Sequence, residues 1–136
     1  MVNPNIKKNS TNAKLVAVYG SLLSGLHNHQ HLRDAEFVGE FWTEPSLKMF
    51  TSGLESYPYI LKNGFTSVKM EVYEIDDDYT ESALDHLEGV NSGLYKKDTI
   101  QTPHGEALYY VRTKKMTDKD TQILTGDWKD YKKLGT

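Results

Sequence analysis

The alternation of apolar and polar side chains is clearest over residues 67–75, SVKMEVYEI. Successive side chains of an extended strand point to opposite faces. One face then carries Val68, Met70, Val72 and Glu74, and the other carries Lys69, Glu71, Tyr73 and Ile75. Apolar atoms occur on both faces, which predicts a strand that is covered on both sides and lies near the centre of a sheet.

Shorter patterns of the same kind predict further strands. They cover residues 14–19, 36–43, 47–50, 59–61, 94–101 and 106–113. The internal glycine of 36–43 predicts a bulge in that strand. Turn residues at 63–64 and 103–105 carry hairpin signals.

One segment has the signals of a helix, from residue 79 or 80 to residue 88. Acidic residues 76–78 precede it, and Gly89 is a natural stop. In the tail, Trp128 and Tyr131 are expected to pack back on the body of the protein. Strands come both before and after one helix in the sequence. This order predicts an α+β fold with a mostly antiparallel or mixed sheet, either open or closed into a small barrel.

Length and composition are those of a soluble globular protein with one domain. The chain has 136 residues, of which 38% are hydrophobic and 26% charged. Residues 1–13 are polar, and their few apolar residues do not recur with the period of a helix or a strand. This predicts a flexible leader before a single domain at 14–136. No stretch approaches the roughly 20 apolar residues that cross a membrane, and no signal peptide is recognisable, so we expect a cytoplasmic protein without a membrane partner.

Charge and cysteine content narrow the chemistry further. A formal net charge of −3 gives no electrostatic reason to expect a nucleic-acid partner. The absence of cysteine excludes thiol catalysis, disulfides and thiolate metal sites.

A polar loop follows the first predicted strand, at Tyr19-Gly20-Ser21-Leu22. Glycine permits a turn here that other residues resist. The backbone N–H groups of residues 20–22 then lack obvious partners in a strand ladder, so they can point at an anion or a carboxylate. The loop is therefore a candidate substrate cradle.

Glu88 stands at the end of the predicted helix, beside Leu84 and Leu87. Burial beside leucines and the dipole at a helix C-terminus both favour the neutral acid, so they raise the pKa of such a carboxyl. A raised pKa makes a carboxyl a useful proton shuttle near neutral pH. The alternative is an exposed residue or an ion pair with one of three basic residues, Lys96, Lys97 or Arg112.

Several short motifs, taken in order over about residues 14–131, resemble the gamma-glutamylcyclotransferase-like family, which includes gamma-glutamylamine cyclotransferases and AIG2-like proteins. The motifs are Tyr19-Gly20-Ser21-Leu22, Gly25, Asn28-His29, Leu32, Tyr57-Pro58, Glu71-Val72-Tyr73, Leu84-Asp85 with Leu87-Glu88-Gly89, and Tyr95. The resemblance implies a small mixed-strand, mostly antiparallel β-barrel with flanking helices and a cavity at its mouth.

The resemblance also implies an activity and the residues that carry it. The loop Tyr19 to Leu22 would hold the glutamyl end of a small gamma-glutamyl amine, amide or peptide, and Glu88 would be the general acid/base. The substrate's own α-amine attacks its γ-carbonyl and yields 5-oxoproline and a free amine, without a cofactor or a metal. Tyr57, Tyr95 and either Tyr109 or Tyr110 would line the pocket. The oligomeric state stays open.

One departure from the family supports a different hypothesis. Met70 stands before Glu71-Val72-Tyr73, where the family often has glycine, and its side chain could fill part of the cavity. The chain would then be a regulatory module that binds a small molecule or a partner without turnover.

Two other readings of the sequence are weaker. The alternating His27, His29 and His31 resemble a metal tract, but no acidic residue completes a hydrolytic motif, so structural or surface histidines are expected. Residues 20–25, GSLLSG, have the glycine spacing of a phosphate loop but lack the Lys and Ser or Thr that must follow.

Overall fold

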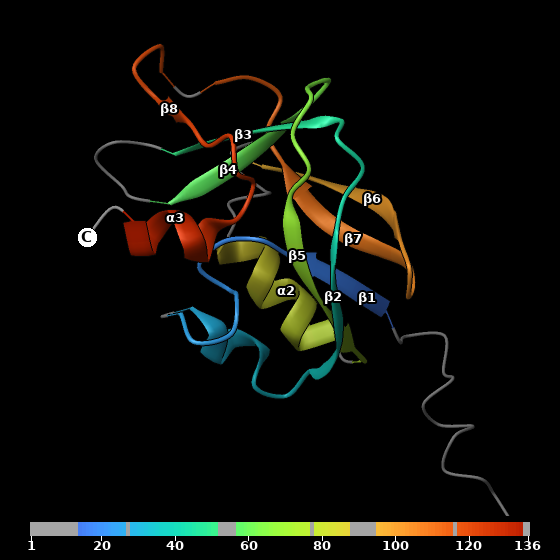
Figure 1. Cartoon of the computed structure of the whole chain (residues 1–136). Helices are drawn as coiled ribbons and strands as arrows, with labels where there is room; N and C mark the ends of the chain where they lie inside the picture. Colours follow the sequence, from blue (N-terminus) through green and yellow to red (C-terminus); the bar gives the residue numbers. More distant parts are fainter. Residues whose placement is uncertain are drawn as a thin grey trace, which may run out of the picture.

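The computed structural model describes residues 14–26, 28–51, 57–76, 78–87, 95–115 and 117–134 (Figure 1). Two sheets and two α-helices make up this part of the chain. The strands are β1 (Lys14–Val18), β2 (Glu36–Trp42), β3 (Leu47–Thr51), β4 (Pro58–Lys62), β5 (Lys69–Ile75), β6 (Lys96–Thr102), β7 (Gly105–Val111) and β8 (Thr121–Gln122). The helices are α2 (Asp78–Leu87), α3 (Trp128–Leu134) and the short 3₁₀ turn η1 (His29–Leu32). The predicted leader, residues 1–13, lies outside the described residues.

The larger sheet has five strands in the order β2-β5-β1-β7-β6. β5 pairs antiparallel with both β1 and β2, so the prediction that residues 67–75 form a central strand is confirmed. β1 runs parallel to β7, which makes the sheet mixed. The register of β2 shifts between Phe37 and Gly39, where the bulge was predicted. The hairpin at 103–105 is also confirmed, because β6 and β7 pair antiparallel across it.

The smaller sheet has the order β4-β3-β8 and corrects one prediction. Asn63 adopts the left-handed backbone conformation of a turn, with φ of 67°, but this turn does not join two paired strands. β4 pairs with β3 instead, and the chain passes from Gly64 into the other sheet. Turn chemistry is local, whereas the partner of a strand is decided by burial of its faces.

The α+β class is confirmed, but the sheet is not closed into the barrel that the resemblance implied. In the described part of the chain, β2 and β6 form the two edges of the larger sheet and do not pair with each other. The chain leaves the larger sheet after β2, forms β3 and β4 in the smaller sheet, and returns at β5, so the strands are divided between two sheets instead of following one continuous ladder.

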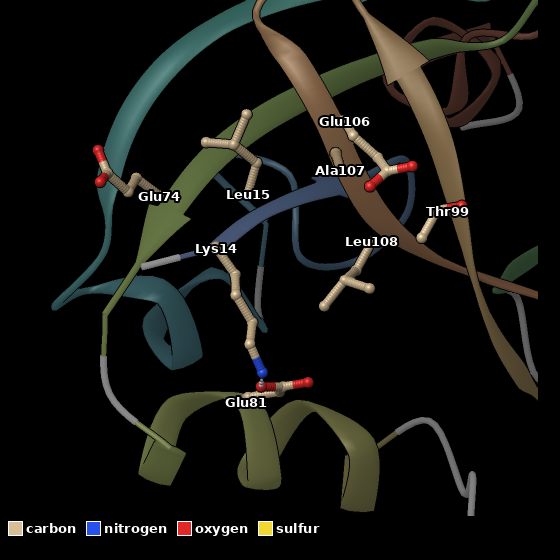
Figure 2. A pocket seen from close by; sticks show the side chains of 8 residues that line it. All are labelled: Lys14, Leu15, Glu74, Glu81, Thr99, Glu106, Ala107 and Leu108. Carbon is tan, nitrogen blue, oxygen red and sulfur yellow. Dashed lines mark hydrogen bonds and ion pairs between the residues drawn. The ribbon is translucent and has the colours of Figure 1, made fainter. Parts of the chain in front are cut away.

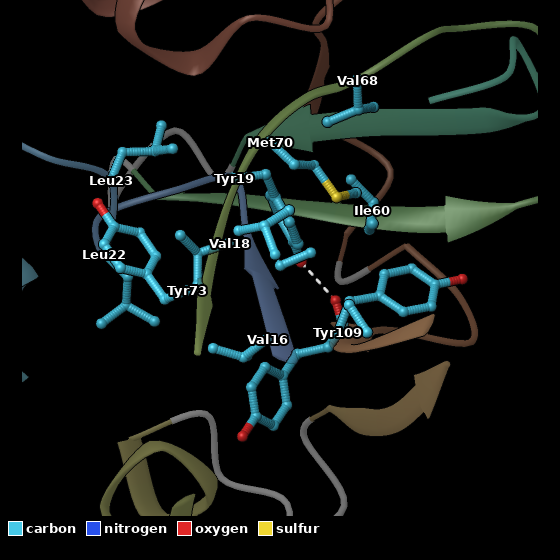
Figure 3. Close-up of a cluster of buried hydrophobic side chains, with 14 of the residues drawn as sticks. Val16, Val18, Tyr19, Leu22, Leu23, Ile60, Val68, Met70, Tyr73 and Tyr109 are labelled. Carbon is cyan, nitrogen blue, oxygen red and sulfur yellow. Dashed lines mark hydrogen bonds between the residues drawn. The ribbon is translucent and has the colours of Figure 1, made fainter. Parts of the chain in front are cut away.

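The main core lies around β1 and β5, where side chains from both sheets and α2 meet (Figure 3). Met70 is fully buried there and packs among Tyr19, Ile60 and Val68. Leu84 of α2 joins the same cluster with 0% of its surface exposed. Such burial contributes about 1.5–3 kcal/mol for each large apolar side chain.

The tail packs on the body as expected. Trp128 is buried, and its ring stacks on that of Tyr131 with centroids 5.6 Å apart. Gly126 just before α3 has φ of +71°, and a Cβ there would stand 1.8 Å from the Ser67 carbonyl oxygen. Only glycine fits at this approach, which directs α3 toward the loop that follows β1.

None of the helices in the described part of the chain has the length and apolar content required to span a bilayer.

Candidate functional site

The loop after β1 is folded by hydrogen bonds to its carbonyl groups. The Leu23 N–H donates to the Gly20 carbonyl over 2.9 Å, and the Asn28 N–H donates to the Ser21 carbonyl over 3.1 Å. The Asn28 side-chain amide also donates to Ser21 Oγ over 2.8 Å. In the hydrogen bonds of the described residues, the N–H groups of Gly20, Ser21 and Leu22 never serve as donors. Three adjacent donors are thus kept outside the ladder, as the sequence indicates, and their role in binding stays a prediction.

Pro58 brings several predicted site residues together. A Cβ on Gly20 would stand 2.8 Å from Pro58 Cγ, so the loop approaches the start of β4 at the closest distance that glycine permits. The Tyr95 hydroxyl donates to the Pro58 carbonyl over 3.3 Å. Tyr57 directly precedes Pro58, is partly buried, and accepts a hydrogen bond from Thr51 Oγ1 on its carbonyl. Gly20, Tyr57 and Tyr95 therefore all lie next to Pro58.

Tyr19 and Tyr110 connect the loop after β1 to α2. The Tyr19 hydroxyl donates to the Tyr110 carbonyl over 2.6 Å, and the Tyr110 hydroxyl donates to Asp85 Oδ1 over 2.7 Å. Both tyrosines are buried. Both hydroxyls donate hydrogen bonds to acceptors within the protein. This favours a structural role for the two tyrosines, which hold the start of the loop, over direct contact with a substrate.

Glu88 lies outside the described residues, directly after the end of α2 at Leu87. The helix begins and ends within two residues of its predicted bounds, and Leu84 is buried as expected. Leu87, in contrast, is 38% exposed. Lys97, one of the alternative partners considered for Glu88, bonds to two other acids, Glu81 at 2.6 Å and Asp85 at 2.9 Å.

Glu71, which belongs to the Glu71-Val72-Tyr73 motif but was given no site role from the sequence, is a buried carboxylate that binds the loop after β1 at Ser24. Glu71 is 5% exposed and accepts hydrogen bonds from the Ser24 N–H and the Ser24 hydroxyl, both at 2.8 Å, and from the Tyr73 hydroxyl at 2.9 Å. Burial by itself would raise the pKa of Glu71, but these hydrogen bonds and the charge of Lys129 lower it below its ordinary value. Burial and the bond to Glu71 raise the pKa of Tyr73. Glu71 is therefore ionised at neutral pH, and Tyr73 keeps its proton.

Lys129 of α3 completes this network. Its Nζ lies 2.9 Å from Ser24 Oγ and 3.3 Å from Glu71 Oε2. A cavity of about 260 Å³ lies beside it, lined by Leu23, Glu40, Lys69, Glu71, Asp127, Lys129 and Asp130. The sequence signal was a glutamate in the middle of an otherwise apolar strand, which required a partner that only the tertiary structure could identify.

A second cavity, of about 380 Å³, lies between β1 and α2 (Figure 2). The ion pair between Lys14 and Glu81, at 2.6 Å, crosses one side of it. Its lining contains none of the predicted site residues. It is therefore separate from the site around Pro58.

The histidine tract shows no metal site in the portion that can be described. His29 Nδ1 lies 2.9 Å from the Leu22 carbonyl oxygen, so this nitrogen carries the proton and donates. The His29 ring packs on Tyr73 with centroids 5.5 Å apart. Within the described residues, no group of three potential metal ligands comes together. His27 lies outside those residues.

Removal of the Tyr110 hydroxyl tests the connection to α2. Tyr110→Phe deletes the hydrogen bond to Asp85, so we expect the free energy of unfolding to fall by about 1–2 kcal/mol. Urea denaturation followed by circular dichroism measures this. Tyr109→Phe is the matched control, because Tyr109 is equally buried and its hydroxyl makes no hydrogen bond within the described part of the chain. Equal losses in both variants would contradict a specific role for the bond.

Comparison with known proteins gives a consistent result. Residues 16–130 match the family described as gamma-glutamyl cyclotransferase, AIG2-like. A Vibrio cholerae protein provisionally named gamma-glutamylcyclotransferase is 38% identical over 116 residues, which are 84% of this chain and 94% of the relative. The Escherichia coli family protein YtfP is 34% identical over 118 residues, covering 87% and 98% of the two chains.

A solved structure agrees in fold. The crystal structure of PH0828 from Pyrococcus horikoshii superposes with a TM-score of 0.74 at 29% identity, over 90% of this chain and 95% of that one. The order of motifs and the match over nearly the whole domain agree, and the chain belongs to the gamma-glutamyl cyclotransferase, AIG2-like family.

Proposed function

We propose that this protein is a gamma-glutamylcyclotransferase, which converts a small gamma-glutamyl compound to 5-oxoproline and a free amine. The observation that carries the proposal is the set of three consecutive loop N–H groups, at residues 20–22, that no hydrogen bond of the described residues uses. Adjacent backbone N–H groups in a loop can bind the α-carboxylate of a glutamyl group. Family membership supports the same reaction class.

The chemistry requires little beyond positioning and proton transfer. The α-amine of the substrate loses a proton to the Glu88 carboxylate and attacks the γ-carbonyl carbon, so that a C–N bond forms and a five-membered ring closes. The bond from that carbon to the leaving nitrogen then breaks, and the protonated Glu88 returns the proton to this nitrogen. Because the nucleophile belongs to the substrate, holding the substrate in a curled conformation supplies most of the acceleration.

The loop must keep its shape for this binding mode. The Glu71 and Lys129 bonds hold Ser24, and Asn28 holds Ser21. These contacts support a cradle whose donors are oriented before the substrate arrives. Such preorganisation lowers the cost of ordering the loop on binding.

The alternative of a binding module depended on Met70 occupying the substrate cavity. Met70 is instead fully buried among core side chains and lines neither of the two described cavities. Its burial supports a role in core packing, and the product assay below decides between the enzyme and the binding module.

A product assay tests the proposal. We expect purified protein, incubated with a panel of gamma-glutamyl amines and gamma-glutamyl dipeptides, to release 5-oxoproline and the matching amine in equal amounts, measured by mass spectrometry. Saturable binding by calorimetry without any 5-oxoproline would contradict the enzyme and favour a binding module. Heat-denatured protein is the control for spontaneous cyclisation.

A further inference from the structure

Polar contacts from three strands hold the helix α2 on the larger sheet. Among the side chains of α2 that can be described, residues 80–87, the buried ones are Thr80 and Leu84. Leu87, in the last turn, is 38% exposed. Apolar contacts have no preferred direction, so a single buried leucine keeps the helix near the sheet but restricts its tilt only weakly. The orientation of α2 therefore depends on its polar contacts.

Two acidic residues on one face of α2 supply most of these contacts. Glu81 and Asp85 are four positions apart, so their side chains are neighbours on the helix surface. Lys97 of β6 donates through Nζ to Glu81 Oε2 over 2.6 Å and to Asp85 Oδ2 over 2.9 Å. Lys14 of β1 donates to the other oxygen of Glu81, also over 2.6 Å (Figure 2). The ammonium group of Lys97 thus joins two successive turns of the helix to the sheet, which restricts both its tilt and its sliding.

The surroundings keep this contact charged. The side chains of Lys97 and Glu81 are 25% and 15% exposed. Burial by itself would lower the pKa of Lys97, but the hydrogen bonds to Glu81 and Asp85 raise it above its ordinary value. Burial would likewise raise the pKa of Glu81, but its bonds to Lys14 and Lys97 lower it. Both partners are therefore ionised at neutral pH, and salt screens such a partly buried pair less than an exposed one.

The same strand pair also holds the loop after β1. Lys97 and Tyr110 lie directly opposite each other in the pairing of β6 with β7. The Tyr110 hydroxyl donates to Asp85 Oδ1, and the Tyr110 carbonyl accepts the hydrogen bond from the Tyr19 hydroxyl. Tyr19 directly precedes the loop N–H groups at residues 20–22. The helix and the loop are thus attached to adjacent points of one strand pair, which sets their separation.

We propose that Lys97 is a positioning residue, which orients α2 so that the residue after its last described turn, Glu88, meets a substrate held by the loop. The inference rests on the proposed function, in which Glu88 is the acid/base. Lys97 touches no reacting atom in this scheme and acts only through the helix. Such a role affects turnover strongly, because a misplacement of about 1 Å costs on the order of 100-fold in rate.

Removal of the charge tests the assignment. Lys97→Met keeps most of the side-chain length but bonds to neither acid. We expect kcat for 5-oxoproline formation, per folded protein, to fall by about 10- to 100-fold, the cost of a misplaced catalytic group. KM should stay within about twofold, because Asn28 and Ser24 hold the loop independently of α2. Circular dichroism at the assay temperature gives the folded fraction, and Lys97→Arg, which keeps the charge, should recover part of the lost kcat.

Lys62→Met is the matched control. Lys62 pairs with Asp98, the neighbour of Lys97 on β6, and this ion pair does not involve α2. Its loss should leave kcat and KM at their wild-type values. A Lys97→Met enzyme with the wild-type kcat, or one whose loss of activity arises from a higher KM, would overturn the proposal.

Hydrogen exchange distinguishes the failure of this inference from the failure of the proposed function. If the wild type converts no gamma-glutamyl compound, the proposed function fails, and amide exchange in residues 78–87 still decides whether Lys97 orients α2. Exchange there should be faster in Lys97→Met than in the wild type and unchanged in Lys62→Met, and equal exchange in Lys97→Met and the wild type rejects the role of Lys97.

A second variant covers the case in which Lys97→Met does not fold. Asp85→Asn removes one of the charges that Lys97 contacts but keeps an oxygen for the Tyr110 hydroxyl. It is expected to lower kcat in the same way, with KM little changed. A folded Asp85→Asn enzyme with the wild-type kcat would count against the orientation of α2 by this contact.

Discussion

Glu88→Gln is expected to reduce 5-oxoproline formation by about 10²- to 10⁴-fold, the usual contribution of a general acid/base. Glutamine keeps the size of the side chain but cannot accept the proton of the ammonium group or return one to the leaving nitrogen. The loop around residues 20–22 is untouched, so substrate should still bind with a similar dissociation constant. Single-turnover kinetics with mass-spectrometric detection, combined with calorimetric binding, separate these two effects.

Glu44→Gln is a suitable control for Glu88→Gln, since Glu44 is an exposed carboxylate on the segment after β2. It should retain wild-type turnover. An active Glu88→Gln enzyme with the wild-type rate would remove Glu88 from the mechanism and leave the loop as the surviving part of the proposal.

Glu71→Gln is expected to lower the free energy of unfolding by about 2–3 kcal/mol at neutral pH and to raise KM for any gamma-glutamyl substrate. The glutamine amide group would present a donor to Ser24, Tyr73 or Lys129, all of which donate to the carboxylate at present. The loop that carries residues 20–22 would then lose its attachment at Ser24. The estimate is below that for a fully buried pair because the Lys129 side chain is 42% exposed.

The same variant has a defined pH dependence. Because the pKa of Glu71 is lower in the folded protein than its ordinary value of 4.5, its ionisation stabilises the fold above that value. This stabilisation is lost as the pH falls below 4.5 toward the lowered folded-state pKa. The difference in stability between wild type and Glu71→Gln should therefore shrink on acidification, which urea denaturation at a series of pH values measures.

Glu74→Gln is the matched control for Glu71→Gln, because Glu74 lies on the same strand but is only partly buried and lines the separate cavity between β1 and α2. It should cost less than about 0.5 kcal/mol. A stability difference for Glu71→Gln that does not vary with pH would show that packing, not charge, explains the loss.

The candidate site could be predicted in part because one portion of it is local. The turn after β1 follows from an apolar run that stops at Tyr19-Gly20-Ser21, and its unused N–H groups follow from the end of the ladder. The remaining contacts join distant residues. Tyr19 and Tyr110 are 91 positions apart, and Ser24 and Lys129 are 105 apart. No periodicity in a single chain indicates such pairs.

The sequence by itself determined the local elements of this protein. The two-residue period of residues 69–75 and the helix signals around 78–87 depend on the backbone and its nearest neighbours, so they could be read directly. Only the tertiary structure decided that β1 runs parallel to β7, that β4 pairs with β3, and that Glu71 is buried against Ser24 and Lys129. The physical reason is that strand pairing and charge burial are settled by which faces can exclude water together, and this depends on the whole chain.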